Sequence, residues 1–422
     1  MEARVINEIM DTVDRLGDDI TETLRQLVRI PSIVGHEGPA QAYLSEQYEN
    51  LGLEVTALEA NRDKLKNHPA FIDSGLGFDG RPNLIGKLPG HPGKKSIILN
   101  GHVDVVSPEP VDQWRRDPWG AEIEDNRLYG RGAMDMKAGL VANLYALKAL
   151  MEAGLKPGGD VLLQSVVEEE AGGGGGTLAC LIEGHTADGM IISEPHPVVC
   201  ISHTGVLYFR VKVKGRTAHA GRAHTGVNAI GKMLKIYQAL ADLDAHRQAT
   251  VRYPLYQADG SPACHLNPGR LTAGDWPSTV AGFAELECRI SFIPGETEAQ
   301  MHRLIEDTVS EVVRTDPWLQ EHPPEIAWFG WHAEPWYQDP GDPFVKMALE
   351  NHERVTGVRT DVKGLSAGLD TRFAAFFGFP SLALGPTGDF PHGYDEYVDL
   401  DSVIRATKTL ALATLDWCSR DK

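Results

Sequence analysis

Histidine and carboxylate residues recur at the ends of apolar segments in this chain. In NGHVDVV, His102 and Asp104 stand two residues apart. On a strand, both side chains project from one face, and the carboxylate can orient a metal-binding imidazole. An ordinary hydrogen-bonded pair is the competing explanation, because histidine has many roles besides metal binding. The spacing alone therefore leaves both interpretations open.

Further acids follow other apolar segments. Asp135 opens a predicted helix after a glycine-rich stretch, where an N-cap role would suffice. Three consecutive glutamates, 168–170, end DVLLQSVVEEE, where like charges repel unless a cation or proton is present; a solvated turn explains them equally well. Glu194 in IISEPHP and His392 in FPHGYDEYV complete the set. Together these residues supply the ligands of a two-metal site, with one acid left as a base.

The elements around these residues indicate an α/β fold. After an N-terminal helix ending near Pro31, short apolar segments alternate with helical patterns, which predicts a mostly parallel central sheet. The carboxyl ends of such strands are where open α/β sheets build their sites. The strands that carry the acids are predicted at residues 95–106, 160–170 and 189–195, and the intervening helix at 135–154.

A different pattern begins near residue 200. An alternating strand (206–215), a helix (226–246), two strands and a helix (297–313) make up most of a ferredoxin-like βαββαβ unit. The α/β pattern then resumes with a helix, a strand and a closing helix. We therefore predict a discontinuous catalytic domain of residues 1–199 and 321–422, with residues 200–320 inserted as an α+β domain.

The composition argues against nucleic-acid and membrane partners. The 422 residues include 40 Lys and Arg against 59 Asp and Glu, for a net charge of -19, and no basic cluster that would suit nucleic acid. No apolar stretch reaches the ~18 residues of a membrane span, and the acidic amphipathic N-terminus differs from a signal peptide. Five scattered cysteines form no CxxC pair. We expect a cytoplasmic protein without a nucleic-acid or membrane partner.

Nine motifs occur in the order typical of one family: GHVDVV, GRGAMDMKAG, VEEEAGG, SEP, GRTAHAG, AGDWPSTV, RISFIPGE, GLDTR and PHGYDEYV. The chain resembles the two-zinc aminoacylase family, which includes acetylornithine deacetylase, succinyl-diaminopimelate desuccinylase and carboxypeptidase G. The resemblance implies a zinc-peptidase-like catalytic domain, an inserted dimerisation or lid domain, and a homodimer. It also implies two divalent metal ions per subunit, zinc by preference, with cobalt or manganese as alternatives.

The resemblance assigns the metal ligands. His102 and Glu194 would bind one ion. Glu170 and His392 would bind the other. Asp135 would bridge the two, and the peptide bond that follows it would be cis.

It also assigns the residues around the ions. Glu169 would be the general base, and Asp104 would orient the histidine two residues before it. His219 would reach the partner subunit's site and stabilise the oxyanion. Arg289 and Arg372 match arginines that resemble substrate-carboxylate anchors, a task suited to a bidentate donor. For Arg372, a structural ion pair with the nearby Asp370 is an alternative.

These assignments predict a metal-dependent amidohydrolase that removes an N-acyl group from an amino acid or related amine. A dipeptidase or carboxypeptidase of the same family would use the same ions with a different pocket. A catalytically inactive binding or scaffold protein is the remaining alternative. That alternative predicts missing ligands, whereas all five ligand positions and Glu169 are acids or histidines here.

Overall fold

The computed structural model describes residues 1–256 and 261–422, which form two compact units. The first contains residues 1–201, 338–363 and 369–422, and the second contains 202–337 and 364–368. The second unit thus extends beyond the boundary that we predicted at residue 320. The reason is β12 (Glu325–Ala333), which pairs with β9 (Gly205–Lys214) in the sheet of that unit.

The first unit is built on a sheet with the strand order β1-β2-β6-β3-β7-β15-β8. Its middle strands, β6, β3, β7 and β15, run parallel. The flanking pairs β1–β2, β2–β6 and β15–β8 are antiparallel, so the sheet is mixed and our prediction of a mostly parallel sheet is wrong for its flanks. The strands are β1 (Glu54–Leu58), β2 (Asn83–Leu88), β3 (Ile97–His102), β6 (Val161–Val166), β7 (Met190–Ile192), β8 (Cys200–His203) and β15 (Ser381–Ala383).

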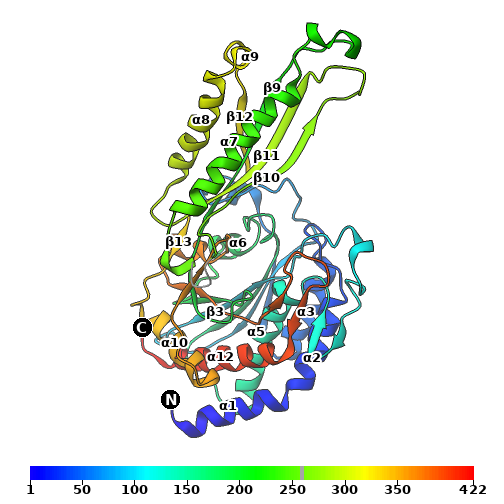
Figure 1. Ribbon diagram of the computed structural model, residues 1–422. Coiled ribbons are helices and arrows are strands. Elements are labelled where there is room, and N and C mark those ends of the chain that lie inside the picture. The colour runs from blue at the N-terminus through cyan, green and yellow to red at the C-terminus, as the bar shows by residue number, and fades with distance from the viewer. Residues whose placement is uncertain (257–260) are drawn as a thin grey trace. The chain divides into compact units, whose positions relative to one another are not determined.

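Helices cover this sheet. α5 (Ala138–Glu152) and α12 (Leu400–Ser419) lie side by side along it (Figure 1). α5 is apolar almost all round and nearly all of it is buried, as expected of a core helix. The predicted N-terminal helix is two helices, α1 and α2, which meet at Leu16. The helices of this unit are α1 (Ala3–Arg15), α2 (Gly17–Val28), α3 (Gly38–Asn50), α4 (Arg62–Leu65), α5, α6 (Thr177–Ile182), α10 (Pro343–Thr356), α11 (Arg372–Phe376) and α12.

A second, smaller sheet in the first unit has the order β16-β17-β5-β4. β5 (Arg127–Tyr129) and β17 (Tyr397–Asp399) are antiparallel, with Tyr129 opposite Tyr397. The segment that follows β5 and the segment that precedes β17 therefore leave the sheet at the same end. This pairing brings residues 130–135 next to residues 390–396.

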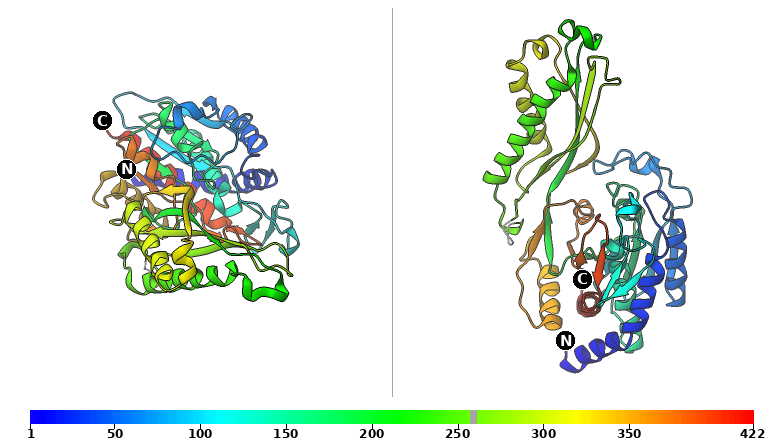
Figure 2. Two further views of the ribbon diagram at one scale, coloured as in Figure 1. Left: turned by 90° about the horizontal axis from the view of Figure 1, so that it is seen from above. Right: turned by 45° about the vertical axis from the view of Figure 1, so that its right-hand side comes forward.

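The second unit has the predicted order of strand, helix, strand, strand and helix, which β12 completes as βαββαβ. Its antiparallel sheet has the order β10-β11-β9-β12 (β10, Leu266–Ala273; β11, Phe283–Phe292). α7 (Ala229–Thr250) and α8 (Glu298–Arg314) lie on one face of the sheet (Figure 2) and share an apolar core with it. Across residues 1–256 and 261–422, none of the helices combines the length and apolarity needed to span a bilayer.

Candidate metal centre

Three neighbouring parallel strands deliver the acids and the first histidine to one edge of the central sheet. β3 ends at His102, β6 leads into the three glutamates 168–170, and β7 leads into Glu194. Because β6, β3 and β7 are adjacent and parallel, their carboxyl ends meet. Asp135 arrives from the segment before α5, and His392 from the loop between β16 (Gly388–Asp389) and β17.

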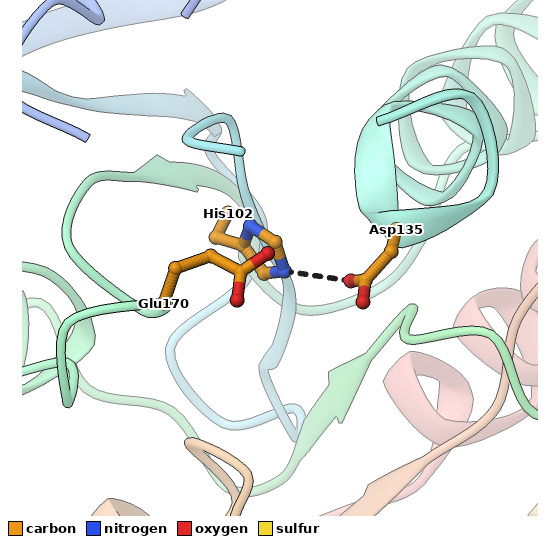
Figure 3. A group of neighbouring side chains, drawn as sticks. All are labelled: His102, Asp135 and Glu170. Atoms are coloured by element: carbon orange, nitrogen blue, oxygen red, sulfur yellow. Dashed lines mark hydrogen bonds and ion pairs between the residues drawn. The ribbon is translucent and has the colours of Figure 1, made fainter. Parts of the chain in front are cut away.

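The imidazole of His102 faces two carboxylates. Its Nδ1 lies 2.8 Å from the backbone oxygen of Asp104, and since a carbonyl only accepts, Nδ1 carries the proton. Nε2 then points toward Asp135 Oδ1 at 3.1 Å (Figure 3) and Glu194 Oε1 at 3.4 Å. A lone pair facing two anionic carboxylates is repulsive unless a proton or a cation lies between them. The arrangement is therefore suited to a bound cation.

Asp135 lies between two histidines. Its Oδ1 faces His102, whereas its Oδ2 lies 3.4 Å from Nε2 of His392. The same Nε2 is 3.0 Å from Glu170 Oε2. The two oxygens of one carboxylate thus face two separate groups of ligands, which is the geometry of a bridging ligand. The peptide bond from Asp135 to Met136 is cis, as predicted.

The pKa values of the proposed ligands are shifted because the side chains are buried and lie close to one another. Hydrogen bonds to Asp135 and Glu170 raise the pKa of His392 to about 10. Burial, together with the charge of Asp135, raises the pKa of Glu194 to about 7. The Asp135 carboxylate is itself buried, which raises its pKa, but hydrogen bonds from the protonated rings of His102 and His392 outweigh burial and hold that pKa below its usual range. Positive charge is therefore favoured at this site.

The three consecutive glutamates have different surroundings. Glu168 is turned toward Ser74 Oγ (2.8 Å) and the guanidinium of Arg81 (3.2 Å). Glu170 faces His392, as described above. Burial, and next the charge of Asp370, raise the pKa of Glu169 well above its usual value. A proton acceptor with a raised pKa suits a general base.

The donor set fits two divalent cations. The ligand atoms of His102, Asp135 and Glu170 lie within 4.8 Å of one another, as do those of His102, Glu169 and Glu194. Glu169 Oε1 and Glu170 Oε1 are buried and have no hydrogen-bond partner among the described residues. Imidazole nitrogens and carboxylate oxygens are the donors that zinc, cobalt and manganese accept. Uncompensated buried oxygens are costly, and a bound cation would satisfy that of Glu170.

Of the three remaining predicted site residues, two belong to the second unit and one to the first. His219 and Arg289 belong to the second unit: His219 is exposed and caps a short turn, and Arg289 is half-buried on β11 opposite Tyr208. Arg372 lies in the first unit, where its guanidinium donates to the backbone oxygens of Gly172 (2.6 Å) and Leu369 (2.8 Å). It is 3.9 Å from Asp370. These contacts support the structural alternative for Arg372, and its role as a substrate anchor stays a prediction.

Two residues around the ligands were missed in the sequence. Arg131 and Glu396 form a buried ion pair of 2.6 Å, and Glu396 also accepts hydrogen bonds from the backbone of the Asp135 segment. Both lie inside quoted motifs, GRGAMDMKAG and PHGYDEYV. Hydrophobic periodicity cannot reveal a contact between two residues so far apart in the chain, so only their positions inside these motifs could have indicated a role at the site.

Comparison with known proteins places the chain among hydrolases. Residues 98–416 match peptidase family M20/M25/M40. The chain is 28% identical to the N-formyl-4-amino-5-aminomethyl-2-methylpyrimidine deformylase of Halalkalibacterium halodurans, over 98% of each chain. It is 31% identical to the deformylase of that name from Bacillus subtilis, over 83% of this chain and 86% of the relative. A succinyl-diaminopimelate desuccinylase of Methylobacterium nodulans is 27% identical over 90% of this chain and 91% of its own length.

Solved structures share the fold at low sequence identity. The dipeptidase Dug1p of Saccharomyces cerevisiae superposes with a TM-score of 0.77 at 17% identity, covering 99% of both chains. A dinuclear metal-binding M20 peptidase of Bacillus subtilis has a TM-score of 0.63 at 14% identity, covering 96% of this chain and 99% of that one.

Proposed function

We propose that this chain, which belongs to peptidase family M20/M25/M40, is a metal-dependent N-deacylase that hydrolyses a linear amide bond in a small molecule. The observation that carries the proposal is the position of Asp135, whose two carboxylate oxygens face His102 and His392. Two divalent ions per subunit, zinc by preference, would be held by these residues with Glu170 and Glu194. The membership confirms the family resemblance that the nine motifs indicated.

The residues divide the chemistry of amide hydrolysis among them. When bound, two divalent cations would lower the pKa of the attacking water and polarise the amide carbonyl. Glu169 accepts the proton of the attacking water on its carboxylate and then donates that proton to the departing amine nitrogen. His219 of a partner subunit would donate a hydrogen bond to the oxyanion. The amine and the free carboxylic acid are the products.

The relatives guide the choice of substrate. The two deformylases match over most of their length, and the desuccinylases over nine-tenths of this chain. Both names describe the release of an amine from a small N-acyl compound. We therefore propose an N-formyl or N-succinyl amide as the substrate, with an N-acyl amino acid as the broader class.

The test is amine release from a panel of purified compounds, with and without a chelator. The panel contains N-formyl-4-amino-5-aminomethyl-2-methylpyrimidine, N-succinyl-diaminopimelate, N-acetyl amino acids and dipeptides. Chelator-sensitive release from an N-acyl compound supports the proposal, and the preferred compound identifies the acyl group. Release from dipeptides alone would make the protein a peptidase, and no release by the metal-loaded protein would contradict a deacylase.

We also propose that the protein is a homodimer through its second unit. Ile230, Leu234 and Tyr237 on α7 are 37%, 51% and 40% exposed and recur at helical spacing. β10, at one edge of the antiparallel sheet, leaves backbone groups available for pairing. An exposed apolar stripe beside a sheet edge suits association with a second copy. Sedimentation of the protein and of Leu234→Glu tests this: a dimer that dissociates in the variant is expected.

The cytoplasm is the proposed location. All five cysteines are buried, which suits a protein that relies on its core rather than on disulfides.

A further inference from the structure

Arg131 and Glu396 connect the two loops that carry Asp135 and His392. Both residues are buried, with 2% and 0% of their surface exposed. Arg131 Nη1 donates to Glu396 Oε2 at 2.6 Å, and Arg131 Nη2 donates to the backbone oxygens of His392 (3.2 Å) and Gly393 (2.9 Å). One guanidinium therefore holds the backbone of the loop that presents His392.

Glu396 performs the reciprocal task. Its Oε2 accepts a hydrogen bond from the backbone N–H of Gly132 at 3.0 Å. Its Oε1 accepts from the N–H groups of Met134 (3.0 Å) and Asp135 (3.1 Å). A residue of the His392 loop thus fixes the backbone of the Asp135 segment, while a residue of the Asp135 segment fixes the backbone of the His392 loop.

The His392 loop needs such support. Phe390, His392 and Asp395 all have positive φ angles of 54° to 61°, which non-glycine residues adopt only when their surroundings hold them there. By contrast, His102 ends β3, whose residues are all buried. The loop therefore depends on contacts from residues outside it to hold its conformation.

We propose that Arg131 and Glu396 are positioning residues that set the spacing between Asp135 and His392 and so form the ion site shared by Glu170 and His392. This rests on the proposed metal centre. The pair acts on ligand geometry, since none of its hydrogen bonds to the described residues goes to the side chain of His102 or Glu194. Its loss should weaken binding of the ion at Glu170 and His392 more than binding of the ion at His102 and Glu194, because the latter ion shares only Asp135 with the pair's contacts.

The test is titration of the apoprotein with Co²⁺, followed by visible absorption and metal analysis. In Glu396→Gln, an NH₂ group replaces one carboxylate oxygen. That group cannot accept the hydrogen bonds from backbone N–H groups that the oxygen accepted in the wild type. In Arg131→Lys, the charge remains but the fork that reaches both Glu396 and the His392 loop is lost. We expect the wild type to bind two ions. Each variant should bind the ion at Glu170 and His392 10- to 100-fold more weakly, which is the usual effect of removing a residue that orients a metal ligand.

A matched control is available in the second unit. Arg247 and Glu296 form a two-pronged ion pair of 2.8 and 2.9 Å, with Arg247 buried. Glu296→Gln should lower thermal stability as Glu396→Gln does, yet bind both ions with wild-type affinity. Wild-type binding of both ions by Glu396→Gln and Arg131→Lys would overturn the proposal, as would equal weakening of both ions. A wild-type protein that fails to bind two ions would instead contradict the proposed metal centre.

Discussion

His102 and Asp104 contact each other through the backbone of Asp104 rather than through its side chain. The imidazole Nδ1 is 2.8 Å from the Asp104 carbonyl oxygen but 3.8 Å from its carboxylate. That carboxylate instead accepts hydrogen bonds from the N–H groups of Glu169 (3.3 Å) and Glu170 (3.1 Å). Asp104 therefore fixes the turn that presents the two glutamates.

This contact makes Asp104→Asn informative. In the wild type, the backbone N–H groups of Glu169 and Glu170 donate to the Asp104 carboxylate. The NH₂ group of asparagine cannot accept a hydrogen bond, so it would displace the glutamate turn. The contact between the backbone carbonyl and His102 would remain. We expect both ions to be retained and kcat to fall 10- to 100-fold. Metal analysis alongside kinetics checks this. Loss of the ion at His102 and Glu194, with the ion at Glu170 and His392 retained, would show that the carboxylate acts through His102 after all.

Glu169→Gln removes the proposed base with almost no change in shape. Because a positioned base contributes about 10²- to 10⁴-fold to the rate, kcat should fall by that factor. The metal content should stay at two ions, since Glu169 is not among the proposed ligands. A variant that keeps most of its activity would refute the assignment, and loss of an ion would make Glu169 a ligand.

The predicted role of His219 across a dimer can be tested by mixing subunits. His219→Ala should lower kcat without releasing metal, and so should Glu169→Gln. If each site uses the partner's His219, a hybrid of the two variants contains one complete site, and a random equal mixture should regain about one quarter of wild-type activity. The exposed His224, in the same turn, provides the control substitution. A mixture no more active than its components would place His219 outside a shared site.

Removal of metal should make stability depend on pH. In the metal-free protein, the pKa of His392 is raised to about 10 and that of Glu194 to about 7, so both groups bind protons more tightly when folded. Their contributions are complete below the unfolded pKa values of 6.5 and 4.5 and are lost as the pH rises through the folded values. The melting temperature of the apoprotein should therefore fall as the pH rises from 5 toward about 10. The metal-loaded protein should show a flatter profile, because cations replace the protons.

The sequence predicted the residues that meet at the metal centre better than the contacts that hold them. His102, Glu170 and Glu194 end apolar strands, and parallel strands must present such residues at one edge, so their meeting follows from local patterns. The partner of Glu396 could not be predicted, because an ion pair across 265 residues leaves no trace in periodicity. The antiparallel flanks of the sheet were missed for a similar reason: strand direction depends on connections, which β1 and β2 do not reveal on their own.

The late position of β17 in the chain has a consequence for biosynthesis. The ribosome releases His102, Asp135, Glu170 and Glu194 within the first half of the chain, whereas His392 and Glu396 emerge almost 200 residues later. Until β17 pairs with β5, the nascent protein would hold an acid-rich part of the proposed site, with ligands for one of the two proposed ions only. Under the proposed assignment, the second ion would bind only after β17 has been synthesised and has paired with β5, so the supply of metal at that step would limit the maturation of the protein.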